Sequence, residues 1–328
     1  MWISRPIMAI ACAVATTLAA SPARAGTDEA ADYPARQITL VVPFPAGSVT
    51  DAVSRVIGNA LSRTLGKPVV IENKAGAQAT IGAAYVAHAK PDGYTLLVSS
   101  WVMYVARGLF KELSYDPVTS FEPVAGFGST AMMFVVPTDS ALRTIGDLAA
   151  QVKQGKAPVN MAYGSPSGQV AVALFSNVSN TTPTAISYRG IPQAMTDLMG
   201  GHVQVAVVDI GTGLTHVNAN KARALAISSS KRYPGAPDTP TLQEAYPGAG
   251  GALETIIGIQ APAGTPKGVV QKLDAAIAKA MATEEVKTQF QALNTSVLSL
   301  SAADFGSRIE RDNPRWMTLM QKAGITPQ

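Results

Sequence analysis

The chain has 328 residues, of which 47% are hydrophobic and 15% are charged, a composition that supplies a large core and excludes an intrinsically disordered chain. The formal net charge is only +4, and the cations are not clustered, which argues against nucleic acid as a partner. The length predicts two domains.

Residues 1–25 have the pattern of a secretory signal peptide. Arg5 precedes an apolar run from Ile7 to Ala20, and the segment ends in Ala23-Arg24-Ala25, a cleavage signal of the A-x-A type. The run is shorter than the roughly 20 residues that span a membrane as a helix. We therefore predict cleavage after Ala25 and an exported mature protein.

Cys12 is the single cysteine of the chain and lies in this apolar run. Removal of the signal would leave the mature protein with neither a disulfide nor a thiol nucleophile. Acylation of Cys12, as in a lipoprotein, is the alternative; it is disfavoured because Ala9 stands where a leucine is usual.

Strand and helix signals alternate in the first part of the mature chain. The β-branched run Ile38–Val42 predicts a strand, the letters PFPAGS interrupt it, and apolar positions at helical spacing predict a helix over 50–65. Strands are expected at 69–71 and 94–99, with a helix over 77–89 between them. This alternation is typical of a parallel sheet covered by helices.

The remainder of the chain repeats the alternation and ends in helices. We predict strands at 132–136, 160–163, 184–188, 203–208, 225–228 and 255–260. We predict helices at 145–154, 168–178, 193–200, 266–281 and 302–323. Two α/β modules joined by extended segments predict two lobes, with ligand sites in the loops that follow the strands.

Signatures of metal binding and covalent catalysis are weak. The three histidines lack metal-ligand spacing, so we expect neither a metal nor a cofactor. Residues 164–168 superficially resemble a nucleophile elbow, but the central position is Pro166. An enzyme that uses a serine or Asp209 is the competing hypothesis, and no base stands in a recognisable arrangement with those serines.

Three Gly- and Ser-rich turns between a strand and a helix are candidate binding segments: 43–51, 164–168 and 188–193. Free amides at a helix start, with the helix dipole behind them, favour a carboxylate. Small residues let a ligand approach the backbone, and hydroxyls add donors. Any one such turn is more commonly an ordinary cap, whereas three together favour a binding site.

Several longer segments carry a resemblance to a known family. They are YPARQITLVVPFPAG at 33–47, LGKPVVIENKAGA at 65–77, PDGYTLL at 91–97 and GHVQVAVVD at 201–209. With these segments the chain resembles the Bug-type family, the extracytoplasmic solute receptors of tripartite tricarboxylate transporters. The resemblance covers nearly the whole mature chain.

The resemblance implies an α/β, two-lobed type II periplasmic binding protein of the Venus-flytrap kind, with a hinge of crossing strands. Lobe one would comprise 33–132 and 257–328, and lobe two 133–256. A monomer of this kind would close on a small carboxylate, aliphatic or aromatic, with one or two acid groups. It would deliver that ligand to membrane permease subunits, with a sensor kinase as the alternative partner.

Together the turns and the resemblance give the expected ligand-binding residues. In this family the proximal carboxylate is held largely by backbone amides, hydroxyls and water. From lobe one we expect Phe44, Ala46, Gly47, Ser48, Thr50, Ser99, Ser100 and Trp101. From lobe two we expect Gly164, Ser165, Ser167, Gly168, Tyr188, Arg189, Gly190 and Asp209.

Some positions depart from the family pattern and leave alternatives open. Trp101 and Tyr104 either form a flat wall for an aromatic acid, or Trp101 is a core or interlobe residue. Arg189 either pairs with a second carboxylate or lies on the surface. Residues 210–213, IGTG, replace a small polar loop that usually contains proline.

Overall fold

The computed structural model describes residues 1–2, 31–248, 252–322 and 324–327. The signal-peptide prediction for 1–25 therefore falls almost wholly outside the described residues. Among the helices of the described part, none combines the length and the apolar character that a membrane crossing needs.

The longest strand, β4 (Phe121–Pro137), runs through both halves of a ten-stranded sheet. Its first half pairs antiparallel with β9 (Glu254–Pro262) and β10 (Ser296–Leu300). Its second half pairs antiparallel with β7 (Val205–Asp209) and β8 (Ala222–Ile227). We call the part built on the first half lobe one and the part built on the second half lobe two.

Lobe one continues beyond β9 with three parallel strands. They are β3 (Thr95–Ser99), β1 (Ile38–Val42) and β2 (Val69–Asn73), in that spatial order. Its helical elements are α1 (Val49–Leu65), η1 (Ala77–Ala79), α2 (Thr80–Ala87), α3 (Trp101–Tyr104), η2 (Ala106–Gly108), α9 (Lys267–Met281), α10 (Glu284–Ala292) and α11 (Ala302–Lys322).

Lobe two extends from β7 through two more parallel strands, β5 (Asn160–Tyr163) and β6 (Thr184–Ser187). Its helices are α4 (Ile145–Gln154), α5 (Pro166–Ser179), α6 (Ile191–Met199), α7 (Ile210–Asn218) and α8 (Leu242–Ala245). Because β3 runs parallel to β4 and β7 runs antiparallel to it, the carboxyl ends of the parallel strands of each lobe face the other lobe.

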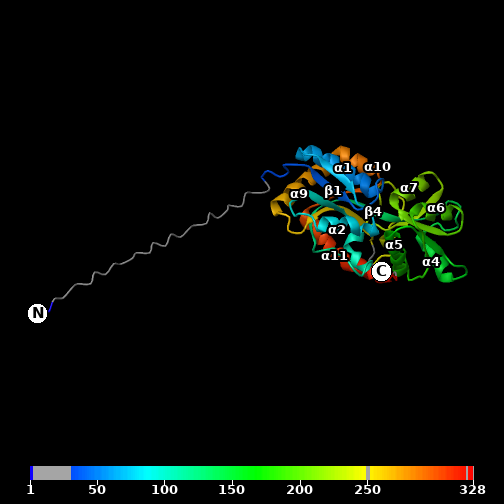
Figure 1. Ribbon diagram of the computed structural model, residues 1–328. Coiled ribbons are helices and arrows are strands. Elements are labelled where there is room, and N and C mark those ends of the chain that lie inside the picture. The colour runs from blue at the N-terminus through cyan, green and yellow to red at the C-terminus, as the bar shows by residue number, and fades with distance from the viewer. Residues whose placement is uncertain (3–30, 249–251, 323, 328) are drawn as a thin grey trace.

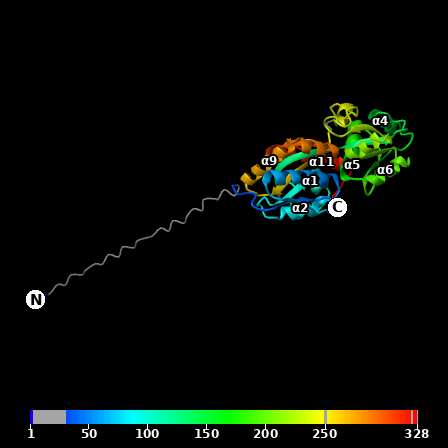
Figure 2. The same ribbon diagram turned by 90° about the horizontal axis from the view of Figure 1, so that it is seen from above.

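Figures 1 and 2 show the two lobes side by side, and Figure 1 shows β4 between them. The helix α11 belongs to lobe one and also packs against α5 of lobe two. Lys322 near its end donates to Asn177 of α5 at 2.9 Å. One hydrophobic cluster consequently includes buried side chains of both lobes, among them Phe175 and Trp316.

The pairing along β4 also bears on the predicted lobe boundaries. Ala131 pairs with Glu254 of β9, and the next residue, Met132, pairs with Asp209 of β7. This change supports a division near residue 132. The boundaries 33–132 with 257–328 and 133–256 stay a prediction.

Most predicted elements form, and two of the differences, in β4 and α7, lie where glycines interrupt the pattern. The strand predicted at 132–136 is the second half of the much longer β4. The helices α7 and α10 and the strand β10 were not expected. Residues 210–213, which replace the loop that is usual in the family, form the first turn of α7.

Candidate functional site

A cavity of about 320 Å³ lies between the lobes. Lobe two lines it with the turn between β5 and α5 and the turn between β6 and α6. Lobe one contributes Gln78 and Leu109, and the end of the chain contributes Ile325 and Thr326. The residues from lobe two are Tyr163, Gly164, Ser165, Pro166, Gln169, Ser187, Tyr188 and Arg189. Arg189 is the only charged side chain among these lining residues.

The two lobe-two turns lie directly against each other. A Cβ atom on Gly164 would stand 2.2 Å from the carbonyl carbon of Gly190 and 2.2 Å from the nitrogen of Ile191. Position 164 therefore accepts only glycine in this arrangement. Gly190 is the N-cap of α6 and provides no side-chain cap, so the first amides of α6 have no acceptor from that residue.

Two serines in the first of these turns accept hydrogen bonds from the protein. Ser165 Oγ caps α5 by accepting from the Gly168 amide at 3.1 Å. Ser167 Oγ accepts from Trp101 Nε1 at 2.7 Å, across the boundary between the lobes. Neither hydroxyl donates to another group in the described part of the chain, but only Ser165 lines the cavity and can offer its proton to an anion there. The predicted residues Ser167, Gly168 and Gly190 are not among the lining residues.

Tyr188 and Arg189 use their side chains differently. The Tyr188 hydroxyl donates to Asp197 Oδ2 at 2.6 Å, a bond that raises the pKa of Tyr188 and lowers the pKa of Asp197. Arg189 is exposed and makes no hydrogen bond or ion pair with any residue that the structure describes. Arg189 is therefore the side chain of this turn that is available to an acid.

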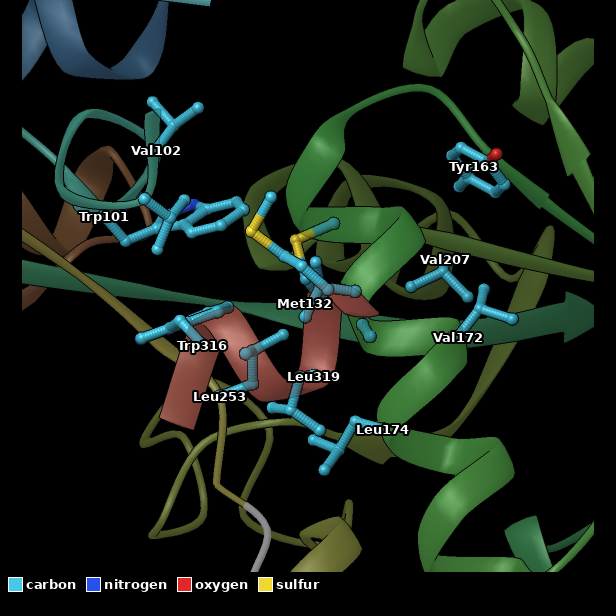
Figure 3. Packing of buried hydrophobic residues seen from close by; sticks show 14 of the residues in the cluster. Trp101, Val102, Met132, Tyr163, Val172, Leu174, Val207, Leu253, Trp316 and Leu319 are labelled. Carbon is cyan, nitrogen blue, oxygen red and sulfur yellow. The ribbon is translucent and has the colours of Figure 1, made fainter. Parts of the chain in front are cut away.

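Trp101 is a buried interlobe residue. Its side chain stacks on Trp316 of α11, with ring centroids 4.4 Å apart and an interplanar angle of 16°, and the residue is 3% exposed. Figure 3 shows the two indoles beside Met132, close to α5. This burial and stacking favour the interlobe alternative for Trp101, and a contact with the ligand stays a prediction.

The rest of the loop after β3 is also buried. The hydroxyls of Ser99 and Tyr104 lie 2.8 Å apart, and Ser100 is 4% exposed. Neither serine lines the interlobe cavity. Trp101 and Tyr104 line a separate small pocket with Phe305 and Trp316, so an aromatic wall for a ligand stays one of the two alternatives.

The turn between β1 and α1 carries its own acid group. Asp51 Oδ2 accepts from the Gly47 amide at 2.9 Å, and Asp51 Oδ1 accepts from Asn73 at 2.9 Å. The Ser48 hydroxyl caps α1 by accepting from the Asp51 amide. The cavity lining does not include the predicted residues Phe44, Ala46, Gly47, Ser48 or Thr50.

Asp51 is also paired with Arg55, whose Nη2 lies 2.9 Å from Oδ1. Burial alone would raise the pKa of Asp51, but the hydrogen bonds from Arg55, Gly47 and Asn73 outweigh it and lower the pKa. A carboxyl whose pKa is lower in the folded than in the unfolded state stabilises the fold above its unfolded pKa, and this stabilisation is lost on acidification.

We therefore expect Asp51→Asn to lower the free energy of unfolding by about 2 kcal/mol at pH 7, because the buried carboxylate accepts several charge-assisted bonds. The difference from the wild type should shrink as the pH falls below about 4. Urea unfolding at several pH values measures both effects. Asp238→Asn, at an exposed carboxylate, is the matched control; an equal loss in both variants would contradict the assignment.

Asp209 serves as the N-cap of α7. Its Oδ1 accepts from the Thr212 amide at 2.8 Å and its Oδ2 accepts from the Thr212 hydroxyl at 2.7 Å. The carboxylate thus already occupies the position at the helix start that favours an anion. Asp209 does not line the cavity, and its part in ligand binding stays a prediction.

Of the three predicted turns, the structure joins 164–168 and 188–193 at one cavity and leaves 43–51 outside it. The sequence analysis missed several lining residues: Gln78, Leu109, Tyr163, Gln169, Ser187, Ile325 and Thr326. For Gln78 a signal was present. The available signal was the letters NKAGAQAT after β2, a further turn of small residues between a strand and a helix. Within the described residues, no group of three or more His, Cys, Asp or Glu side chains could hold a metal ion.

Comparison with known proteins identifies the class of this molecule. The pattern of the tripartite tricarboxylate transporter family receptor matches residues 53–325. The chain belongs to this receptor family. The receptor is 31% identical to protein BugT of Bordetella pertussis over 329 residues, which covers 99% of each chain.

Solved structures place the receptor among periplasmic solute-binding proteins. It is 32% identical to the periplasmic binding protein BugD, with a TM-score of 0.74, over 90% of this chain and 100% of that one. It is 28% identical to R. palustris Rpa4515 with adipate, with a TM-score of 0.78 and the same coverage. It is 29% identical to MatC from Rhodopseudomonas palustris with bound malate, with a TM-score of 0.73, over 88% and 99%. The predicted family and two-lobed fold are confirmed.

Proposed function

We propose that this receptor binds a small dicarboxylate between its lobes and delivers it to the membrane permease of a tripartite tricarboxylate transporter. The observation that carries the proposal is the interlobe cavity, whose lining has hydrogen-bond donors and one cation but no acid. A pocket of this character favours an anion small enough for about 320 Å³. The receptor would work in the periplasm after removal of residues 1–25.

One carboxylate would lie at the junction of the two lobe-two turns. The Ser165 hydroxyl has a free proton there, and α6 begins at Ile191 without a side-chain cap. The positive end of the helix dipole adds to the attraction. Arg189, which has no acid partner in the described part of the chain, would pair with the second carboxylate of the ligand.

The adipate and malate of the two R. palustris relatives support this ligand class. Both are dicarboxylates, and both relatives cover nearly the whole of this chain. Binding would shift the population toward a closed form, because contacts from both lobes are complete only when the strands β4 and β9 let the lobes approach. The permease would then recognise the closed surface.

Tryptophan fluorescence offers a direct binding assay. The chain has three tryptophans, and Trp2 lies in the predicted signal, so the mature receptor would retain only the stacked pair Trp101 and Trp316. Titration with adipate, malate and other dicarboxylates should change the fluorescence saturably, and a ligand at 100 times its dissociation constant should stabilise the fold by about 2.7 kcal/mol. No saturable response or thermal shift with any carboxylate would contradict the proposal.

Arg189→Gln should show whether Arg189 binds the second carboxylate of the ligand. We expect the affinity for adipate to fall about tenfold, because one charge-assisted bond is lost at a solvent-accessible site. The affinity for hexanoate, which lacks the second acid group, should change less than about threefold. Isothermal titration calorimetry measures both values.

Arg143→Gln is the matched control, since Arg143 is an exposed arginine of lobe two that does not line the cavity. It should leave both affinities unchanged. Equal losses for adipate and hexanoate in Arg189→Gln would show that Arg189 binds the carboxylate common to both. An unchanged affinity for adipate would exclude Arg189 from the site.

A further inference from the structure

The turn between β2 and α2 has an unusual backbone. Three consecutive residues with side chains, Ala77, Gln78 and Ala79, have positive φ angles of 42°, 51° and 77°. This left-handed region is unfavourable for residues that carry a Cβ atom, and runs of it are rare. Glycine would adopt the same angles without that penalty.

The burial of Ala79 and two hydrogen bonds hold the turn in this conformation. Ala79 is 2% exposed and belongs to the same hydrophobic cluster as Trp101. The Ala79 amide donates to the Gly76 carbonyl at 3.0 Å, and the Thr80 hydroxyl donates to the Ala77 carbonyl at 2.8 Å. A strained backbone conformation persists only where the surrounding structure enforces it, and such conformations are found often at ligand clamps.

The conformation of this turn places Gln78 at the interlobe cavity. Gln78 is exposed, and it lines the interlobe cavity with Ser165 and Arg189 of lobe two. Its carboxamide makes no hydrogen bond in the described part of the chain. The group therefore keeps two donor hydrogens and an acceptor oxygen for a ligand.

We propose that Gln78 is a specificity-determining residue, a polar side chain with which lobe one contacts a bound dicarboxylate. This inference rests on the proposed function. Of the other lining residues outside lobe two, Leu109 and Ile325 are apolar and Thr326 offers a single hydroxyl at the end of the chain, so Gln78 is the one carboxamide among the lining residues on this side of the cavity. A ligand that bonds both to Gln78 and to the lobe-two turns binds the closed form better, which is the differential affinity that closure requires.

The test compares Gln78→Gly with Ala77→Gly, a matched substitution one residue earlier that removes no cavity side chain. Each variant relieves one positive φ angle, although glycine also loosens the unfolded chain. We expect both to raise the melting temperature of the ligand-free receptor by about 1–3 °C. Only Gln78→Gly should lower the affinity for adipate, by about 5- to 10-fold, because hydrogen bonds to the ligand are lost.

Gln78→Glu provides a third measurement. The substitution keeps the size of the side chain and replaces the donor group with a carboxylate, which should repel adipate and lower its affinity by more than Gln78→Gly does at pH 7. Melting temperatures come from circular dichroism, and dissociation constants from calorimetry with adipate as the probe.

The outcomes separate this inference from the proposed function. If the wild type bound adipate and both Gln78→Gly and Gln78→Glu bound it with the same affinity, the role of Gln78 would be overturned and the proposed function would stand. Equal weakening in Gln78→Gly and Ala77→Gly would assign the effect to the backbone and overturn it as well. If the wild type bound neither adipate nor any other carboxylate, the proposed function on which the inference rests would be contradicted.

Discussion

Trp101→Ala is expected to lower the free energy of unfolding by about 3–5 kcal/mol, the range observed when a large buried aromatic side chain is removed. Trp101 is 3% exposed, stacks on Trp316 of lobe one and donates to Ser167 of lobe two. The substitution therefore leaves a cavity between the lobes and removes the partner of a hydroxyl. Urea unfolding, followed by circular dichroism, measures the loss.

Trp101→Phe separates packing from hydrogen bonding. A phenyl ring can still stack on Trp316, but it cannot donate to Ser167, so we expect a smaller loss of about 1–2 kcal/mol. Val297→Ala, at an exposed apolar residue, should change the stability by less than about 0.5 kcal/mol. If Trp101→Ala were as mild as that control, Trp101 would not be an interlobe packing residue.

The parallel strands and their helices could be predicted because their patterns are local. The predicted helix over 145–154 and strand over 160–163 match α4 and β5. The first half of β4 was missed because Gly126 and Gly128 interrupt its apolar run. These glycines serve packing, since a Cβ at Gly126 would lie 3.1 Å from Leu300 and one at Gly128 would lie 3.2 Å from Phe290.

The same effect concealed α7. Gly211 and Gly213 lower the helix propensity of its first turn, so the sequence indicates a loop. In the structure, a Cβ at Gly213 would stand 2.5 Å from the sulfur of Met133. The glycine lets α7 pack closely on β4, and no local pattern reveals which side chain requires that space.

In the site, too, features set by the local sequence could be predicted, and features set by the tertiary structure could not. The turns at 164–168 and 188–193 could be predicted, because small residues and hydroxyls before a helix are visible in the sequence. The burial of Trp101 could not, since a tryptophan suits a core and a pocket equally. The position of Gln78 depends on positive φ angles that residues other than glycine rarely adopt.

Gly164→Ala should abolish most of the ligand affinity, because Gly164 is the point where the two lobe-two turns meet. Its added methyl group would lie 2.2 Å from backbone atoms of Gly190 and Ile191, and backbone cannot rotate away as a side chain can. The turns must separate by roughly 1 Å to restore van der Waals contact. That displacement moves the Ser165 hydroxyl away from the start of α6, so one carboxylate can no longer contact both.

We expect the affinity of Gly164→Ala for adipate to fall by at least about thirtyfold, equivalent to about 2 kcal/mol, and the free energy of unfolding to fall by about 1–3 kcal/mol through overpacking. Gly146→Ala on α4 is the control, because its Cβ would meet only Thr144, at 3.6 Å. It should fold and bind adipate as the wild type does. Because Gly164→Ala can be assayed well below its melting temperature, a folded variant with wild-type affinity would show that the junction of these turns does not hold the ligand.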